Sequence, residues 1–210
     1  MSTLYTHVLK RAADLVVSGI LIVMLAPLML AVAGTVRLVL GKPILHFDER
    51  AGLHGRPFRL AKFRSMTEDR DADGHLLPDG ARLGAFGRGL RRTSLDELPQ
   101  LFSVFAGRMS LVGPRPLPLR YVPRYSARQA TRLSVRPGLT GWAQIHGRNS
   151  VDWPERLELD AQYVDMLGRP SAPLIDTWIL GATLFHTAVQ ACTGRGVSAA
   201  GTATMHEFTP

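Results

Sequence analysis

The longest apolar stretch of the chain lies near its N-terminus. Residues 15–36 carry no charged side chain, and about 18 to 20 apolar residues are enough for a helix that crosses a membrane. Basic residues flank both ends of this stretch, with Lys10 and Arg11 before it and Arg37 and Lys42 after it. Because cytoplasmic flanks of membrane helices are typically basic, we expect both ends on the same side of the membrane.

Pro27 interrupts this apolar stretch and predicts a kink, because proline removes a backbone hydrogen bond and collides with the preceding turn. Each arm, at about 12 residues, would be ~18 Å long, which is shorter than a hydrocarbon core of about 30 Å. We therefore expect a re-entrant hairpin that dips into the membrane and returns. Two alternatives stay open: a spanning helix that tolerates the proline, and a cleaved signal peptide with residues 31–33 as its cleavage site.

Beyond Gly41 the pattern changes to short segments rich in glycine, proline and arginine. Residues 44–47 and 56–63 alternate apolar and polar side chains around Gly52 and Gly55, which predicts a small β-hairpin. Residues 68–80 are polar, and their acidic side chains lack the spacing of a calcium-binding EF-hand loop. This segment is expected to be a solvated loop.

Three later segments predict helices. The first has an apolar stripe at positions i, i+3, i+4 and i+7, made of Leu98, Leu101, Phe102 and Phe105. The second, residues 154–167, begins with Pro154, which is favoured in the first turn of a helix. Its apolar side chains form one stripe, made of Leu157, Ala161, Val164 and Leu167. The third, residues 174–191, is strongly apolar, and it fits either a membrane interface or the protein core.

The chain has 210 residues and a formal net charge of +8, which fits one domain or one domain with an appendage. The basic balance favours phosphate-bearing partners such as nucleic acid, nucleotides or an anionic membrane surface. The single cysteine, Cys192, excludes an internal disulfide framework. Charge alone does not select among these partners.

An acidic pair, Asp96 and Glu97, lies where the first of these helices begins. Ser94 and Glu97 have the spacing of a capping box, in which the two side chains satisfy backbone groups at a helix start. Pro99, however, falls beyond the first turn of a helix capped at Ser94, so such a cap is imperfect. The pair is therefore either a helix cap or a reactive site.

Two further segments suggest anion and nucleotide binding. The sequence GPRPLP, residues 113–118, holds Arg115 between prolines, and a guanidinium on a stiff loop can bind phosphate through two donors. Residues 136–149 are rich in glycine and contain Trp142 and Gln144, side chains that can contact a base or a sugar. The alternatives are a rigid turn and a β-turn with one core tryptophan. The sequence contains no Walker lysine motif, no H-E-x-x-H and no C-x-x-C.

These segments, taken in order, resemble the small monotopic phosphoglycosyl transferases of the bacterial sugar transferase family. The resemblance covers nearly the whole chain and rests on KRAAD (10–14), the apolar stretch broken at Pro27, KFRSM (62–66), LRRTSLDELPQ (90–100), MSLVGPRP (109–116), RPGLTGWAQIHGRN (136–149) and VSAAGTATMHEF (197–208). The sequence FDERAGL, residues 47–53, departs from the family's pattern. There the family has a glutamine near Asp48 and a proline at Ala51, so the role of Arg50 is open.

The resemblance implies transfer of a sugar 1-phosphate from a UDP-sugar to polyprenol (undecaprenyl) phosphate, giving a polyprenyl diphospho-sugar and UMP. It implies that Asp96 is the nucleophile and a Mg²⁺ ligand, that Glu97 completes the dyad, and that Arg115 binds phosphate. A carboxylate can attack phosphorus to form a covalent intermediate, and Mg²⁺ lets one anion approach another. The same motifs contain further candidates for substrate and phosphate binding: Lys62, Arg64, Arg91, Gln144 and Arg148.

We therefore expect a helix-rich α+β fold with a small β-hairpin, in which residues 1–41 form the re-entrant anchor and residues 42–210 the catalytic domain. Interfacial amphipathic helices would rest on the phospholipid membrane, at the cytoplasmic face of the bacterial inner membrane. The expected partners are the UDP-sugar, polyprenol phosphate and downstream glycosyltransferases of glycoconjugate assembly, and not nucleic acid. Two alternatives are a membrane-tethered metal-dependent phosphodiesterase and a non-catalytic basic membrane scaffold.

Overall fold

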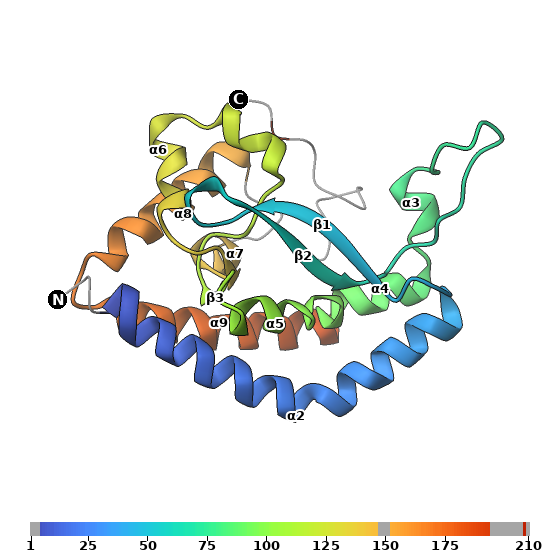
Figure 1. Ribbon diagram of the computed structural model, residues 1–210, viewed down its shortest axis with the longest axis horizontal. Coiled ribbons are helices and arrows are strands. Elements are labelled where there is room, and N and C mark those ends of the chain that lie inside the picture. Colours follow the sequence, from blue (N-terminus) through green and yellow to red (C-terminus); the bar gives the residue numbers. More distant parts are fainter. Residues whose placement is uncertain (1–4, 147–151, 194–207, 209–210) are drawn as a thin grey trace.

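The computed structural model describes residues 5–146, 152–193 and 208. Two long helices form its lower layer, and short helices and two small sheets lie above them (Figure 1). The longer helices are α2 (Lys10–Val39), α8 (Trp153–Leu167) and α9 (Ala172–Thr193). The short ones are α3 (Asp79–Arg82), α4 (Ala85–Arg92), α5 (Gln100–Phe105), α6 (Ala127–Ala130) and α7 (Trp142–Ile145). The expected helix-rich α+β fold is confirmed.

Each of the two sheets has two strands. Strands β1 (Leu45–Ala51) and β2 (Pro57–Phe63) form the predicted antiparallel hairpin, while β3 (Ser110–Val112) and β4 (Gly138–Thr140) pair in parallel. In the hairpin, Lys62 lies opposite His46 and Phe58 lies opposite Arg50. Because directly paired residues share a sheet face and side chains alternate along a strand, Lys62 and Arg50 are on the same face of the hairpin.

Helix α2 continues through Pro27 as one helix. It is bent near its middle, and the bend projects away from the rest of the protein while both ends approach it (Figure 1). The helix is long and apolar enough to cross a membrane by length and composition, and 17% of its most apolar window is buried. The expected kink is therefore present, and the bent shape fits the re-entrant geometry.

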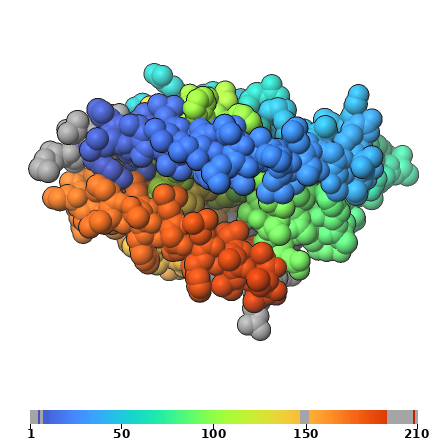
Figure 2. Space-filling view, turned by 90° about the horizontal axis from the view of Figure 1, so that it is seen from below, coloured from blue at the N-terminus to red at the C-terminus, as the bar shows by residue number. Residues whose placement is uncertain are grey.

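The lower face of the molecule is apolar. Helices α2 and α9 lie side by side on it (Figure 2), and their exposed large side chains include Val16, Ile20, Val23, Met24 and Leu30 on α2 and Leu174, Trp178, Leu184 and Phe185 on α9. On α9 the neighbouring Ile179 is fully buried whereas Trp178 is 54% exposed. The core interpretation of residues 174–191 is thus confirmed for one face of the helix, whereas contact of the other face with a membrane interface stays a prediction.

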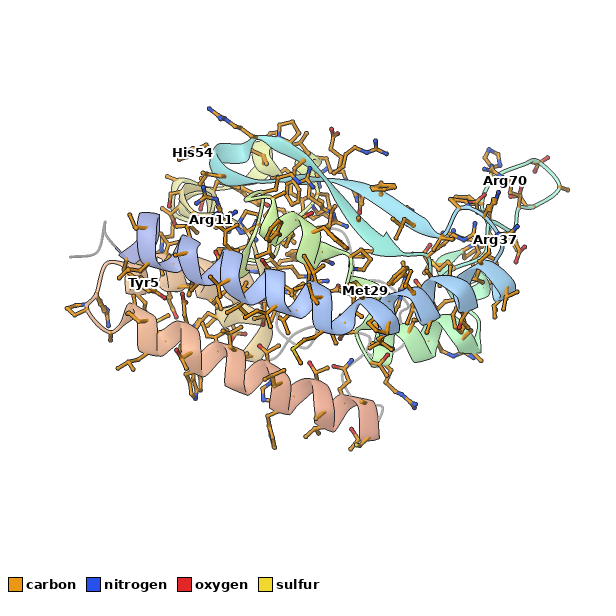
Figure 3. All side chains as sticks on the ribbon, turned by 60° about the horizontal axis from the view of Figure 1, so that its bottom comes forward. Tyr5, Arg11, Met29, Arg37, His54 and Arg70 are labelled. Carbon is orange, nitrogen blue, oxygen red and sulfur yellow. The ribbon has the colours of Figure 1, made fainter. Side chains whose placement is uncertain are left out.

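The start of α2 is fastened to the protein body by polar contacts. Arg11 donates hydrogen bonds to the backbone oxygens of Val104 and Phe105, both of 2.8 Å, at the end of α5. Buried Asp14 accepts a hydrogen bond of 2.9 Å from the backbone nitrogen of Leu111 in β3. Figure 3 shows Arg11 pointing from α2 to the side on which the hairpin lies. These contacts give the KRAAD segment a structural role.

The second half of α2 shares a core with the remainder of the chain. Met29, Val32 and Val36 pack in one buried cluster with Phe63 of β2 and Leu90 of α4. Helix α2 ends at Val39, close to the expected boundary after residue 41, yet the anchor is packed onto the body. The division into residues 1–41 and 42–210 stays a prediction.

Two predicted helices differ in how closely they match the structure. Helix α8 agrees with the prediction, with its start capped by Asp152, whose Oδ1 accepts a hydrogen bond of 2.9 Å from the backbone of Glu155. Helix α5 begins only at Gln100, and its predicted apolar stripe is divided because Leu101 is buried whereas Phe102 and Phe105 are about half exposed. The two exposed rings belong to the outer surface of the protein.

Candidate active site

The acidic pair lies in a tight turn between α4 and α5. Residues Leu95–Glu97 form a single 3₁₀ turn, which follows Ser94 in a left-handed conformation with φ of 56°. The Ser94 side chain makes no capping hydrogen bond, so the capping-box interpretation is wrong. The physical reason is Pro99, which has no backbone N–H and therefore prevents one continuous helix from Ser94 into α5.

Glu97 is held by two cations from different parts of the fold. Its carboxylate accepts a hydrogen bond of 2.8 Å from Lys62 Nζ in β2 and hydrogen bonds of 2.5 and 3.3 Å from Arg115 Nη2 and Nη1. Burial acts to raise the pKa of Glu97, but the charges of Arg115 and Lys62 outweigh burial and hold this pKa well below its usual range. In return, Glu97 raises the pKa of Arg115. Glu97 is therefore ionised at neutral pH.

Asp96 differs from Glu97 in its electrostatic environment. It is 6% exposed, and burial, followed by the charge of Glu97, raises the pKa of Asp96 to about 6, although Lys62, Arg91 and Arg115 act in the opposite direction. Its negative charge is thus only partly balanced by the protein. A buried carboxylate of this kind is suited to attack an electrophile or to bind a cation.

The dyad offers one carboxylate that fits a magnesium ion. Both oxygens of Glu97 accept hydrogen bonds from Arg115, and one of them also accepts from Lys62, which leaves Asp96 as the carboxylate whose charge a cation would balance. Mg²⁺ prefers oxygen ligands and is commonly bound by one or two carboxylates together with substrate phosphates and water. The residues present therefore fit Mg²⁺ with Asp96 as its protein ligand.

A second acidic group lies in the exposed loop before α3. Among the described residues, Asp71, Asp73 and His75 are the one group of three potential metal ligands within reach of one another. Asp71 Oδ1, however, accepts hydrogen bonds of 3.0 and 2.9 Å from the backbone nitrogens of Asp73 and His75. The group organises its own loop, as expected for a solvated segment.

The loop that carries Arg115 is packed tightly against the glycine-rich segment. Gly113 donates a backbone hydrogen bond of 2.8 Å to Thr140, and Gly138 donates one of 2.9 Å to Pro114. A Cβ atom on Gly138 would lie 2.1 Å from Gly113 N, and one on Gly141 would lie 2.1 Å from Gly113 O. These glycines thus permit close contact between two backbone segments, whereas the sequence interpretation assigned such contact to a ligand.

Two residues that were not selected from the sequence, Arg132 and Asp160, fix the backbone of the loop that carries Arg115. Arg132 Nη2 donates a hydrogen bond of 2.5 Å to the backbone oxygen of Arg115, and its Nε and Nη2 donate to Asp160 Oδ2 at 3.1 and 2.9 Å. The side chains of Arg132 and Asp160 are each 2% exposed. The available signal was Asp160 itself, an acid three residues after Leu157 on the apolar stripe of α8.

Of the remaining basic residues expected to bind substrate or phosphate, some lie around the dyad and one does not. Lys62, Arg91 and Arg115 surround the dyad, since all three charges act on Asp96, and Arg91 Nε also donates a hydrogen bond of 3.0 Å to Ser65 Oγ. Arg64 donates hydrogen bonds to the backbone oxygens of Leu40 and Lys42 beyond the end of α2, so the structure does not bring it to the dyad.

The last two candidates come from the glycine-rich segment. The amide atoms of Gln144 are buried without a hydrogen-bond partner among the described residues, and a Cβ atom on Gly141 would lie 3.0 Å from Gln144 Oε1. Arg148 lies outside the described residues. A substrate role for Gln144 or Arg148 stays a prediction.

Comparison with known proteins identifies the family of this chain. The profile of the family described as bacterial sugar transferase matches residues 5–190. The chain is 50% identical over 158 residues to an uncharacterized sugar transferase, EpsL, of Bacillus subtilis (strain 168), which covers 75% of this chain and 78% of that protein. It is 34% identical over 207 residues to the exopolysaccharide production protein ExoY of Sinorhizobium fredii, which covers 89% and 87% respectively.

A longer relative has a more specific name. The chain is 36% identical over 184 residues to the UDP-glucose:undecaprenyl-phosphate glucose-1-phosphate transferase of Klebsiella pneumoniae, which covers 85% of this chain but 40% of that protein. Residues 5–190 of this chain, which the family profile matches, include the dyad, the Arg115 loop and helix α2. The chain belongs to the bacterial sugar transferase family.

Proposed function

We propose that this protein transfers a sugar 1-phosphate from a UDP-sugar to undecaprenyl phosphate, giving undecaprenyl diphospho-sugar and UMP. The observation that carries the proposal is the buried Asp96 carboxylate beside Glu97, which Lys62 and Arg115 bind from two other parts of the fold. The names of relatives support it, since the protein of Klebsiella pneumoniae is a UDP-glucose:undecaprenyl-phosphate glucose-1-phosphate transferase and one of Salmonella typhimurium is an undecaprenyl-phosphate galactose phosphotransferase.

The reaction divides into two displacements at one phosphorus atom. In the first, a carboxylate oxygen of Asp96 attacks the β-phosphorus of the UDP-sugar, the bond from that phosphorus to the bridging oxygen breaks, and UMP leaves. In the second, an oxygen of the lipid phosphate attacks the same phosphorus and Asp96 is released. Splitting one transfer into two steps through a covalent intermediate is a common means of lowering a barrier.

The dyad residues have distinct tasks in this scheme. With a pKa of about 6, Asp96 is largely ionised at pH 7 to 8, and its burial removes much of the water that would otherwise solvate the nucleophile. Glu97 positions Arg115 and Lys62, and Arg115 can bind phosphate oxygens through two donors. A bound Mg²⁺ would supply further positive charge between Asp96 and the phosphates of the donor.

The apolar lower face supports the location of this reaction at a membrane. Helices α2 and α9 lie along that face (Figure 2) and expose large apolar side chains, so the protein can rest in one leaflet while the acceptor lipid arrives in the bilayer plane. The soluble UDP-sugar would enter from the cytoplasm. We accordingly place the protein on the cytoplasmic face of the bacterial inner membrane, where downstream glycosyltransferases would extend its product into a glycoconjugate.

The covalent intermediate provides the test. Wild-type protein incubated with Mg²⁺ and a panel of UDP-sugars, without lipid acceptor, should gain the mass of one phosphosugar on the peptide that contains Asp96. Addition of polyprenol phosphate should remove this mass and sustain UMP release. Asp96→Asn should form no adduct and release no UMP, whereas Glu97→Gln should be impaired but still form the adduct. A folded and fully active Asp96→Asn protein would contradict the proposal.

The same assay separates the two alternatives. A metal-dependent phosphodiesterase would release free sugar phosphate and UMP without any lipid acceptor. A non-catalytic scaffold would release no UMP under any condition, and neutralising Asp96 would leave its function unchanged.

A further inference from the structure

Arg50 lies beside the segment that carries Arg115, although the two residues are far apart in the sequence. Arg50 of β1 forms an isolated antiparallel bridge with Pro118, and the next residue, Ala51, donates a backbone hydrogen bond of 3.0 Å to Leu117. The end of β1 is thereby fixed to the chain that follows Arg115. Since Arg50 also shares a hairpin face with Lys62, its side chain belongs to the same side of the hairpin as the dyad.

The guanidinium of Arg50 is only partly satisfied by hydrogen bonds to the described residues. One terminal nitrogen, Nη2, pairs with the carboxylate of Asp48, and Nε is buried without a hydrogen-bond partner within the part of the chain that the structure describes. A buried donor that lacks a partner destabilises the protein, because its lost contact with water is not replaced. Such a donor is expected to be satisfied when a ligand binds.

The charges around Arg50 indicate the kind of ligand. Burial lowers the pKa of Arg50, and the positive charges of Arg115 and Arg120 act in the same direction, against the opposite effect of Asp48. Glu97 is already bound by Arg115 and Lys62. The positive charges of Arg50 and Arg115 act on each other, and an anion with several oxygen acceptors would match them.

We propose that Arg50 binds the phosphate that leaves with the nucleotide, next to Arg115, and that Asp48 holds Arg50 while no donor is bound. This inference rests on the proposed function, in which the donor has two adjacent phosphates. Arg115 binds Glu97 of the dyad and so serves the phosphate that Asp96 attacks. The other phosphate gains negative charge as the bond to the bridging oxygen breaks, and Arg50 is a cation beside Arg115 with a buried donor that lacks a partner among the described residues.

Asp48 makes the inference testable in two directions. Its carboxylate competes with a phosphate for the Arg50 guanidinium, so its removal should strengthen binding of the nucleotide phosphate, whereas removal of Arg50 should weaken it. The pair of Asp48 and Arg50 would therefore tune the release of UMP.

The experiment measures the inhibition constant of UMP, which serves as the probe, for the wild-type, Arg50→Gln and Asp48→Asn proteins in lipid nanodiscs. We expect Arg50→Gln to raise the inhibition constant of UMP and the KM for the UDP-sugar about tenfold or more, with a smaller change in kcat. Asp48→Asn should lower the inhibition constant of UMP about threefold or more. The matched control is Arg59→Gln, because Arg59 is an exposed arginine of the same hairpin that lies on the opposite face, over the ring of Phe47.

Each outcome decides a separate point. An inhibition constant within twofold of wild type in both Arg50→Gln and Asp48→Asn would overturn the inference, and so would an equal effect of Arg59→Gln. If Arg50→Gln does not fold, the direction of the Asp48→Asn effect still decides. If the wild-type protein transfers no sugar phosphate, the proposed function fails, while direct calorimetric binding of UMP to the same four proteins still tests Arg50.

Discussion

Arg132 Nη2 lies 2.5 Å from the backbone oxygen of Arg115, so one arginine positions the loop from which another is presented. Arg132→Lys keeps the charge but cannot contact Asp160 and the Arg115 carbonyl through a fixed planar group. We expect kcat/KM for sugar phosphate transfer to fall about tenfold, which corresponds to ~1.4 kcal/mol. Because this loss would act through Arg115, the effects of Arg132→Lys and Arg115→Lys should not add in the double variant. Additive losses would contradict the positioning role.

Arg115→Lys tests the clamp itself. Lysine keeps a positive charge near Glu97 but cannot donate two parallel hydrogen bonds to a phosphate. The transfer rate is expected to fall about ten- to a hundredfold, equivalent to ~1.4 to 2.7 kcal/mol. The control is Arg128→Lys, since Arg128 contacts Glu158 through two donors at an exposed site. A normal rate in Arg115→Lys would reduce the loop to a structural turn.

Asp96→Asn should stabilise the protein in the absence of a divalent cation. Asp96 has a pKa of about 6 in the folded state against an ordinary value of 3.8. A group whose folded pKa is raised binds its proton more tightly in the native state, so its contribution is most favourable below pH 3.8 and is lost as pH rises through 6. At pH 8 the ionised carboxylate therefore costs stability, at most about 3 kcal/mol, which asparagine removes.

Thermal unfolding in detergent with a chelator provides the measurement. The melting temperature of Asp96→Asn should exceed that of wild type at pH 8, and the difference should shrink towards pH 4. A variant that is less stable than wild type at pH 8 would show that Asp96 stabilises the fold, as a helix cap does.

The elements that the sequence predicted correctly are those whose pattern is local. The hairpin of β1 and β2 follows from two alternating segments around glycines, and α8 follows from Pro154 and its apolar stripe. The acidic pair alone fitted a helix cap equally well, and the resemblance to the family, which rests on several short motifs in order, selected it as the dyad. In the hairpin and in α8 the informative residues lie close together in the sequence, so no contact between distant residues was needed to recognise them.

What the sequence did not reveal depends on contacts between distant residues. The contact between Arg132 and the Arg115 carbonyl joins residues 17 positions apart, and no sequence motif marks Arg132. Arg64 belongs to the KFRSM motif and was expected to bind substrate or phosphate. Its guanidinium instead donates hydrogen bonds to the backbone oxygens of Leu40 and Lys42 beyond the end of α2. The hydrogen-bond partners of both arginines are backbone carbonyl groups, whose positions are set only when the chain has folded.

Gly87 is expected to be intolerant of any side chain. A Cβ atom on Gly87 would lie 1.8 Å from the backbone oxygen of Ser65, whereas nothing lies within 4 Å of a Cβ atom on Gly89 in the same helix. Gly87→Ala must therefore displace α4 from Ser65, and with it the hydrogen bond from Arg91 to Ser65 Oγ. Gly89→Ala should instead stabilise the helix by about 0.5 to 1 kcal/mol.

Thermal unfolding and transfer assays of the two glycine variants check this contrast. Gly87→Ala should lower the melting temperature and the transfer rate together, and Gly89→Ala should leave the rate unchanged. Equal stability of the two variants would show that α4 adjusts to the added methyl group without cost.

The membrane topology can be tested through the bend of α2. Its two ends approach the protein body while the bend projects away (Figure 1), so both ends should be on the cytoplasmic side. In a Cys192→Ser background, cysteines introduced as Thr3→Cys and Lys42→Cys should both be shielded from an impermeant thiol reagent added to intact cells. Both should react after permeabilisation. Labelling at position 3 alone in intact cells would indicate a helix that spans the membrane.

Pro27→Leu provides the matched perturbation of this topology. Leucine restores the backbone N–H that proline lacks and removes the clash with the preceding turn, so α2 should straighten. A straight helix of 30 residues, at about 1.5 Å per residue, is longer than a hydrocarbon core of about 30 Å and can span it. We therefore expect a fraction of Pro27→Leu molecules to expose position 3 to the external reagent, with a matching loss of transfer activity. Complete shielding with full activity would mean that the packing of Met29, Val32 and Val36 against Phe63 and Leu90 fixes the topology without the proline.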